Sequence, residues 1–522
     1  MKKNYSLALA AAALCAIVVF FAFKPGRSSA ALPEVIRIDD GSVSGVKDQS
    51  GEITSWKGIP FAAPPVGNLR WKAPQAVPNW DGVKKCDAFG PSPMQGKPVP
   101  FGVYTKEFLI PDEPISEDCL YLNVWAKNNA PEKKPVFVWI YGGGFVSGGA
   151  GVPIYDGEAM ARKGVVFVSV NYRVGIFGFL AHPELTKESP EHASGNYALL
   201  DQIAALKWVK RNIAKFGGDP QNVTIAGQSA GSMSVNCLVA SPAAKGLFKK
   251  AIAESGSLMV ANPTIKTKTL QEAEEQGVKT AIAVGAKSLA ELRKVPAEQL
   301  LKAGGGYSPI VDGYVLPEPV WKIFAGHREN DVPLMAGWNA DEGFVTTFQK
   351  KEEFVKMAHS RYGDKAEEFL KYFPAGTDAE ADRSQVKLSR DMIFAMSGYK
   401  WAGIQSGRNV PVYVYYFEHK LPATPEFEKY GAFHTGEVAY VMDNLKFLYR
   451  PWKDTDHTLA DAMSAYWVNF IKSGNPNGKG LPEWPEYNAD QSRVMVFGDK
   501  PVAGPLPDKG ELNFMIRQVE GK

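Results

Sequence analysis

A serine flanked by glycines is the first feature of this sequence that could do chemistry. Gly-Gln-Ser-Ala-Gly occupies residues 227–231, after a predicted strand at 222–226 and before a predicted helix. The glycines permit a tight, strained turn that would expose Ser229 at the positive end of the helix dipole. The five residues alone are equally compatible with a structural turn, but their place between strand and helix indicates a nucleophile.

A glycine-rich segment upstream could stabilise the anion that forms when a serine attacks an ester. Gly142, Gly143 and Gly144 follow an apolar run at residues 135–141, which predicts a buried strand. Each preorganised N–H donor in such a segment lowers the barrier by roughly 3–4 kcal/mol. A phosphate-binding loop would need Lys and Ser/Thr after the glycines, and Phe145-Val146-Ser147 does not fit that pattern.

A serine nucleophile needs a histidine as base and a carboxylate to orient it, in the chain order Ser, acid, His for this kind of turn. Position alone favours His434, in a loop after the predicted strand 411–418, with His419 at the end of that strand as the alternative. The charged surroundings of His327, His359 and His457 predict that these three face solvent. For the acid, position leaves Asp341 and Glu342 open, with Asp312 as an outside choice.

Strands that alternate with helices must position these groups. Apolar runs at 135–141, 165–171 and 222–226 predict strands buried on both faces, and residues 196–212 have helical spacing. Further strands are expected at 332–338 and 411–417, and a late helix at 456–472. This alternation predicts an α/β fold with a mostly parallel sheet and helices on both faces. The segments around 262–305 and 350–405 are interpreted as helical cap insertions within a single domain, residues 32–522.

Composition excludes several classes of protein. The 522 residues are 45% hydrophobic and 22% charged, which excludes global disorder. The formal charge of +3 comes from 59 basic and 56 acidic residues, so no excess of charge favours nucleic acid as a partner. The sequence contains no HExxH and no paired CxxC, and we expect no metal and no organic cofactor.

The first 31 residues have the pattern of a signal peptide: a basic start, an apolar run at 7–23 and small residues after it. Without them the charge becomes −1, with 55 basic against 56 acidic residues. We expect an exported protein, periplasmic or secreted. The alternative is that residues 7–23 form a membrane anchor. A contact with the membrane is therefore expected only if this segment is retained. Export permits disulfides, and Cys237 is interpreted as a buried free thiol.

Together these residues resemble the type-B carboxylesterase family, which includes bacterial p-nitrobenzyl esterases, mammalian carboxylesterases and cholinesterases. The resemblance covers nearly the whole chain after residue 31. It rests on seven ordered blocks: residues 57–62, 116–123, 171–175, 216–220, 227–231, 339–343 and 434–437.

The resemblance implies an α/β-hydrolase fold and a serine carboxylesterase that works through an acyl-enzyme. It implies a triad of Ser229, Glu342 and His434, and so decides for Glu342 over Asp341. It implies that Gly143, Gly144 and Ala230 donate to the oxyanion. It also implies a disulfide between Cys86 and Cys119, and two structural ion pairs, Arg70 with Glu117 and Arg173 with Asp201.

The sequence departs from the family at two places. Tyr141 stands where many members have His before the glycines, which puts little in doubt because backbone donors make the oxyanion site. Cholinesterases have a Trp that stacks on choline, and residues 87–118 contain no Trp, so choline esters are not expected. The three-glycine loop resembles that of esterases accepting bulky alcohols, so we expect a small-molecule ester with bulky or aromatic groups. A monomer or weak homo-oligomer is expected; an amidase, a lactonase or an adhesion module are the rival functions. The residues that we expect at the pocket are Tyr104, Phe108, Trp338 and Phe394.

Overall fold

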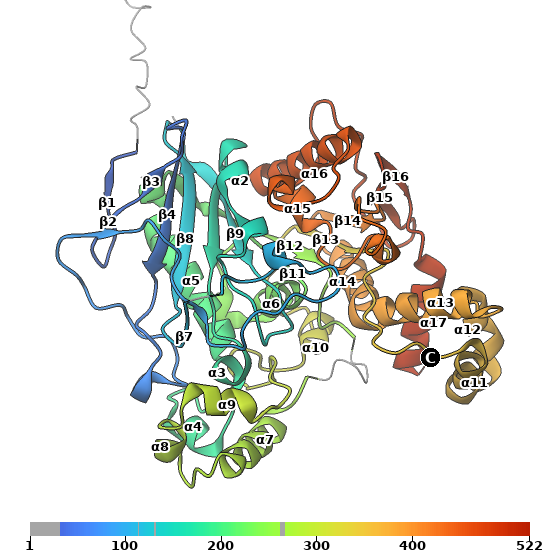
Figure 1. The fold of residues 1–522 in the computed structure, drawn as a ribbon, viewed down its shortest axis with the longest axis horizontal. Coiled ribbons are helices and arrows are strands. Elements are labelled where there is room, and N and C mark those ends of the chain that lie inside the picture. Colours follow the sequence, from blue (N-terminus) through green and yellow to red (C-terminus); the bar gives the residue numbers. More distant parts are fainter. Residues whose placement is uncertain (1–31, 113, 130–131, 261–266, 522) are drawn as a thin grey trace, which may run out of the picture.

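The computed structural model describes residues 32–112, 114–129, 132–260 and 267–521 (Figure 1). The predicted signal peptide, residues 1–31, lies outside the described residues. Among the described residues, no helix combines the length and the apolar character needed to span a bilayer.

A mixed sheet of eleven strands forms the centre of the molecule (Figure 1). Its middle strands are parallel, and the strands at each end run antiparallel to their neighbours. In spatial order the strands are β16 (Pro501–Pro505), β15 (Arg493–Phe497), β14 (Val412–Phe417), β13 (Leu334–Asn339), β12 (Lys250–Glu254), β11 (Gly218–Gln228), β9 (Lys134–Ile140), β10 (Val166–Val170), β8 (Tyr121–Lys127), β4 (Ile53–Pro60) and β3 (Val46–Lys47).

The central strands are buried on both faces, as their continuous apolar sequences predict. Every residue of β10, β12, β13 and β14 is buried. Helices α5 (Tyr197–Asn212) and α6 (Ala230–Ala240) pack on β11, while α2 (Glu158–Arg162) packs on β8 and β10, and α16 (Asp454–Ser473) on β9. This is the predicted α/β-hydrolase architecture, and the prediction is confirmed.

Two helical groups project beyond the sheet in Figure 1, although the last helix of the second group, α14 (Met396–Ser406), packs on β13 and β14. Helices α7 (Leu270–Ala283), α8 (Leu289–Leu292) and α9 (Ala297–Lys302) form the lower group, next to α4 (Pro183–Glu188). The second group follows β13 and consists of α11 (Lys351–Tyr362), α12 (Ala366–Tyr372), α13 (Asp378–Arg390), the π-helical segment η7 (Asp391–Ala395) and α14 (Met396–Ser406). The last helix, α17 (Lys509–Glu520), packs against α12 and α14.

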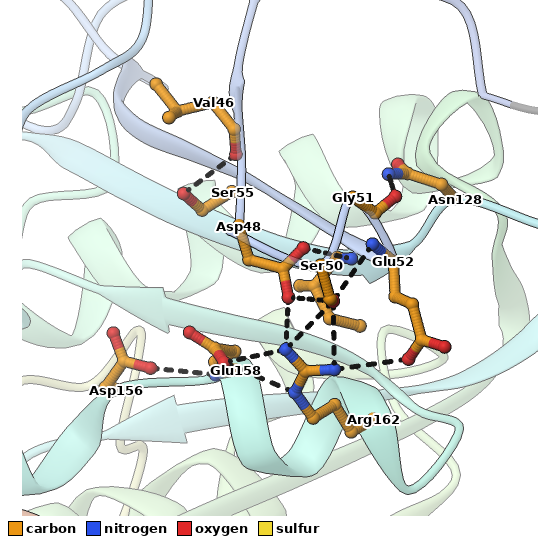
Figure 2. A network of polar contacts seen from close by, with 11 residues as sticks. Val46, Asp48, Ser50, Gly51, Glu52, Ser55, Asn128, Asp156, Glu158 and Arg162 are labelled. Carbon is orange, nitrogen blue, oxygen red and sulfur yellow. Dashed lines mark hydrogen bonds and ion pairs between the residues drawn. The ribbon is translucent and has the colours of Figure 1, made fainter.

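An arginine ties the edge of the sheet to the helix beside it (Figure 2). Arg162, at the end of α2, contacts Asp48 and Ser50 of the turn between β3 and β4, and its guanidinium lies 3.2 Å from the Glu52 carboxylate and 3.0 Å from Glu158. Because Arg162, Glu52 and Glu158 are partly exposed, water and salt weaken their attraction. The cluster therefore positions the turn beside α2 but contributes little to the free energy of unfolding.

Both structural ion pairs implied by the family resemblance are present. Arg70 Nε donates to Glu117 at 2.7 Å, and Arg173 makes bonds of 2.8 and 2.7 Å with the two oxygens of Asp201. Burial raises the pKa of Asp201, while Arg173 opposes that shift. This second pair is almost wholly buried and fixes the segment after β10 onto α5.

The expected disulfide between Cys86 and Cys119 is absent, which corrects that prediction. Cys86, Cys119 and Cys237 are buried free thiols, and burial raises the pKa of each. The Cys86 carbonyl accepts from Lys57 of β4, whereas Leu120, next to Cys119, pairs with Phe61. Bridged cysteines need Cα atoms within about 7 Å, whereas Cys86 and the neighbour of Cys119 are bonded to separate positions along the chain, Lys57 and Phe61. Met94, not Cys86, lines the same small cavity as Cys119.

Candidate active site

The predicted nucleophile lies in a strained turn between β11 and α6. Ser229 has φ 59° and ψ −125°, and its N–H donates to the Glu254 carbonyl at 2.8 Å. A methyl group on Gly231 would lie 2.0 Å from the Ile140 carbonyl oxygen, and one on Gly227 would lie 2.5 Å from Gly231. The turn therefore has glycine on both sides because the end of β9 packs against it.

The glycine loop after β9 packs directly on this turn. A Cβ on Gly142 would lie 2.9 Å from the Cβ of Ser229. Gly143 and Gly144 have φ of 113° and 62°, and the Gly143 carbonyl accepts from Ser147 N–H at 3.0 Å. The N–H groups of Gly143, Gly144 and Ala230 donate to no other group among the described residues. They are available to bind an anion beside Ser229.

Tyr141 has a structural role in the same loop. Its ring stacks on Tyr172 with centroids 4.3 Å apart, and each hydroxyl donates to the other residue's carbonyl, at 2.8 and 2.7 Å. This reciprocal pair ties the ends of β9 and β10 together. The start of the glycine loop is thereby fixed through a side chain that does not enter the site.

The structure brings His434 and Glu342 together. Glu342 follows β13, and its carboxylate accepts from His434 Nδ1 at 2.8 Å and from Asn339 N–H at 3.0 Å. Both side chains are almost completely buried. A buried carboxylate at Nδ1 leaves Nε2 as the nitrogen that can take a proton.

The alternatives left open by sequence position have other contacts. Asp341 accepts from Ala432 N–H at 2.9 Å and so braces the histidine loop, and Asp312 closes a turn by accepting from Tyr314 and Leu316. His419 lies between Asp456 and Asp499, at 2.8 and 3.0 Å, outside the site. The other three histidines after Ser229 are exposed as predicted, namely His327, His359 and His457.

Gln228 is a site residue that sequence analysis missed. Its side-chain amide nitrogen lies 3.0 Å from His434 Nε2, whereas Ser229 Oγ makes no hydrogen bond with any described residue. In this structure, the Gln228 amide is therefore hydrogen-bonded to the histidine nitrogen that can take a proton. Contacts between a serine and its base are often looser without substrate. The only sequence signal was its place directly before the nucleophile.

Aromatic rings hold the imidazole. Phe394, from the π-helical segment η7, stacks on it at 4.3 Å, and Phe344 meets it edge-on at 5.2 Å. Tyr104 donates its hydroxyl to the His434 carbonyl at 2.8 Å. Of the residues expected at the pocket, Tyr104 and Phe108 line it and Phe394 contacts the histidine, but Trp338 is a core residue of β13 and that prediction was wrong.

A cavity of about 520 Å³ joins these groups. Ser229, His434 and the three glycines lie on its wall, together with an apolar set from residues 98–110 and with Val152, Tyr155 and Phe344. A second cavity, of about 570 Å³, lies between residues 61–76 and α5 and contains none of the site residues. The smaller cavity is the one where an apolar ester would meet the serine.

Comparison with known proteins agrees with this geometry. The model of the carboxylesterase family matches residues 33–515. The chain is 36% identical over 494 residues to the fumonisin B1 esterase of Sphingopyxis macrogoltabida, covering 90% of this chain and 88% of that protein. It is 36% identical over 490 residues to the para-nitrobenzyl esterase of Bacillus subtilis, covering 89% and 94%, and 32% identical over 512 residues to carboxylesterase 1C of Mus musculus, covering 89% of each.

Proposed function

The chain belongs to the carboxylesterase family and is a carboxylic-ester hydrolase, and we propose that it works by a serine mechanism through an acyl-enzyme intermediate. The observation that carries this proposal is the His434–Glu342 hydrogen bond of 2.8 Å, on the wall of the cavity that also exposes Ser229. The buried carboxylate orients the imidazole and stabilises the positive charge that it gains in the reaction.

The first half of the reaction makes the acyl-enzyme. His434 exchanges its contact with Gln228 for one with the Ser229 hydroxyl and takes the proton on Nε2, while Oγ bonds to the ester carbonyl carbon. The carbonyl oxygen becomes an anion, which the N–H groups of Gly143, Gly144 and Ala230 bind. Return of the proton to the alcohol oxygen expels the alcohol and leaves the acyl group on Ser229.

Water reverses the sequence in the second half. His434 takes a proton from water, the hydroxide adds to the acyl carbon, and the same three N–H groups bind the new oxyanion. Collapse of this intermediate breaks the bond to Ser229 Oγ, which takes back a proton from His434. The carboxylic acid leaves and the free enzyme is restored.

We infer that the substrates carry bulky or aromatic groups. The support is the cavity wall, where Tyr104, Phe108, Tyr155 and Phe344 surround the serine with apolar surface. Two of the three relatives described above are named as a fumonisin B1 esterase and a para-nitrobenzyl esterase. Rates over a series of esters with increasing alcohol and acyl size test this inference.

Export is also part of the proposal, with residues 1–31 as a cleaved signal peptide. It is supported by the basic start, apolar run and small residues of that segment. The intact mass of the chain recovered from the periplasm or medium tests it. A mass that includes residues 1–31 would contradict cleavage.

The serine mechanism is tested by Ser229→Ala, with Ser234→Ala, on the same helix, as the matched control. We expect Ser229→Ala to abolish hydrolysis of p-nitrophenyl butyrate and covalent labelling by an organophosphonate. Ser234 accepts a hydrogen bond from Gln202 at 3.1 Å away from the cavity, so its variant should keep both activities. Labelling of the folded Ser229→Ala protein at the rate of the unmodified enzyme would refute the mechanism.

A further inference from the structure

Two fully buried carboxyl groups lie near the catalytic residues, and no cation among the described residues forms an ion pair with either of them. Glu254 ends β12 and Glu437 precedes α15 (Val438–Val441), and both are 0% exposed. Glu254 Oε1 accepts from Trp467 Nε1 at 2.8 Å, and Glu437 Oε2 from the Asn339 amide. In the described part of the chain, Glu254 Oε2 and Glu437 Oε1 have no hydrogen-bond partner, and neither carboxyl group forms an ion pair.

The groups that face this pair add no positive charge. Tyr155, Tyr415 and Glu342 interact electrostatically with it, and the Tyr415 hydroxyl is itself buried without a partner. Burial, the larger cause, raises the pKa of Glu254 to about 8, and burial followed by repulsion from Glu254 and Glu342 raises the pKa of Glu437 well above its ordinary value. Two neighbouring carboxyl groups in such surroundings do not both ionise at neutral pH.

The pair is bonded to all three members of the triad through short links. Asn339, whose amide contacts Glu437, donates its backbone N–H to Glu342 at 3.0 Å and its side-chain N–H to the Phe433 carbonyl, next to His434, at 2.9 Å. The Glu254 carbonyl accepts from Ser229 N–H at 2.8 Å. Movement of the Glu437 carboxyl group is therefore transmitted through Asn339 to Glu342 and to the loop of His434, while a shift of the Glu254 backbone would reach Ser229.

We propose that Glu254 and Glu437 retain at least one proton between them at neutral pH and act as positioning residues for Ser229, Glu342 and His434. With that proton, the two carboxyl groups carry at most one negative charge in their buried site. Loss of the proton leaves two like charges there that repel each other and Glu342, and this repulsion displaces Asn339 and the loop that holds the histidine. Activity therefore falls on the alkaline side when the pair loses this proton.

The inference rests on the proposed serine mechanism, and its test compares three variants over pH 5–10. Glu254→Gln keeps the size and polarity of the side chain but cannot ionise, Glu254→Leu removes its polar atoms, and Glu483→Gln removes an exposed carboxylate as the control. Because Glu254→Leu leaves Trp467 Nε1 buried without its acceptor and distorts the strand end that holds Ser229, we expect it to lower kcat at pH 7 by roughly tenfold or more. Glu254→Gln should recover most of that loss and move the alkaline decline of kcat upward by about one pH unit or more.

If Glu254 had a purely structural role, its substitution would not shift the pH at which kcat declines on the alkaline side. An alkaline decline at the same pH in the unmodified enzyme and in Glu254→Gln overturns the proposal, as does the absence of a decline in the unmodified enzyme up to about pH 9.5. If Glu254→Gln does not fold, the same comparison with Glu437→Gln decides.

A second readout separates this proposal from the proposed function. An acid whose pKa is raised in the folded state keeps its proton after the unfolded chain has lost it, so stability falls as pH rises through that window. We expect the midpoint of thermal unfolding to decline between about pH 5 and 8 and Glu254→Gln to flatten that decline. This measurement tests the shared proton even if Ser229→Ala disproves the serine mechanism; unchanged slopes would refute it.

Discussion

A single methyl group on Gly143 should disable the oxyanion site. Gly143 has φ 113°, and a Cβ there would lie 2.3 Å from the Ser147 carbonyl oxygen and 2.7 Å from its carbon. These are backbone atoms of the turn that Gly143 itself closes, so the loop must shift and redirect its N–H groups. Loss of one donor costs about 3–4 kcal/mol of barrier, which is roughly a 10²- to 10³-fold decrease in kcat.

The assay is kcat for p-nitrophenyl butyrate, measured with Gly143→Ala and with Gly164→Ala as the matched control. Gly164 also has a left-handed φ, 91°, but a Cβ there meets nothing within 4 Å. That variant incurs only the backbone strain of about 1–2 kcal/mol, which should lower stability and leave kcat intact. Gly143→Ala that folds and keeps kcat within about tenfold would refute the assignment of Gly143 to the oxyanion site.

Three further predictions concern the supports of the site. Asp201→Ala should cost about 3–5 kcal/mol in urea unfolding because it leaves Arg173 buried without its counter-charge; a loss below about 1 kcal/mol would contradict this. Burial raises the pKa of Asp456, but the hydrogen bonds to its carboxylate outweigh burial and keep that pKa below its usual value. The ionised Asp456 therefore stabilises the fold, and this stabilisation is lost as pH falls through its pKa. Asp456→Asn should therefore flatten the acid limb of a stability–pH curve, and an unchanged limb would count against it. Tyr104→Phe removes the bond to the His434 carbonyl and should cost about 1 kcal/mol by thermal unfolding, with an unchanged midpoint as the contrary result.

Local patterns in the sequence predict the elements that carry the site. Continuous apolar runs at residues 135–141, 165–171 and 222–226 predict strands because they suit a sheet covered on both faces, and β9, β10 and β11 form at these places with slightly different bounds. The glycines around Ser229 and after β9 mark places where backbone approaches backbone, and the structure shows those approaches. Such features depend on neighbours within a few residues, so sequence pattern reveals them.

Pairings between distant residues required either the family resemblance or the structure. Sequence position did not decide between the adjacent residues Asp341 and Glu342 as the acid. The path of the chain after β13 decides that Glu342 faces His434 and that Asp341 bonds to Ala432. The disulfide prediction failed for the same reason. Cys86 is bonded to Lys57 of β4, whereas the neighbour of Cys119 is bonded to Phe61 after that strand, and no local pattern in the sequence encodes this separation.

The sequence by itself determined the nucleophile turn, the glycine loop and the alternation of strands and helices, because each depends on backbone conformation and on apolar periodicity over short stretches. Only the tertiary structure placed Gln228 at Nε2, brought Phe394 onto the imidazole from a π-helical segment, and buried Glu254 beside Glu437. Those contacts join residues that are up to 206 positions apart, as for Gln228 and His434, and depend on how the packed layers meet.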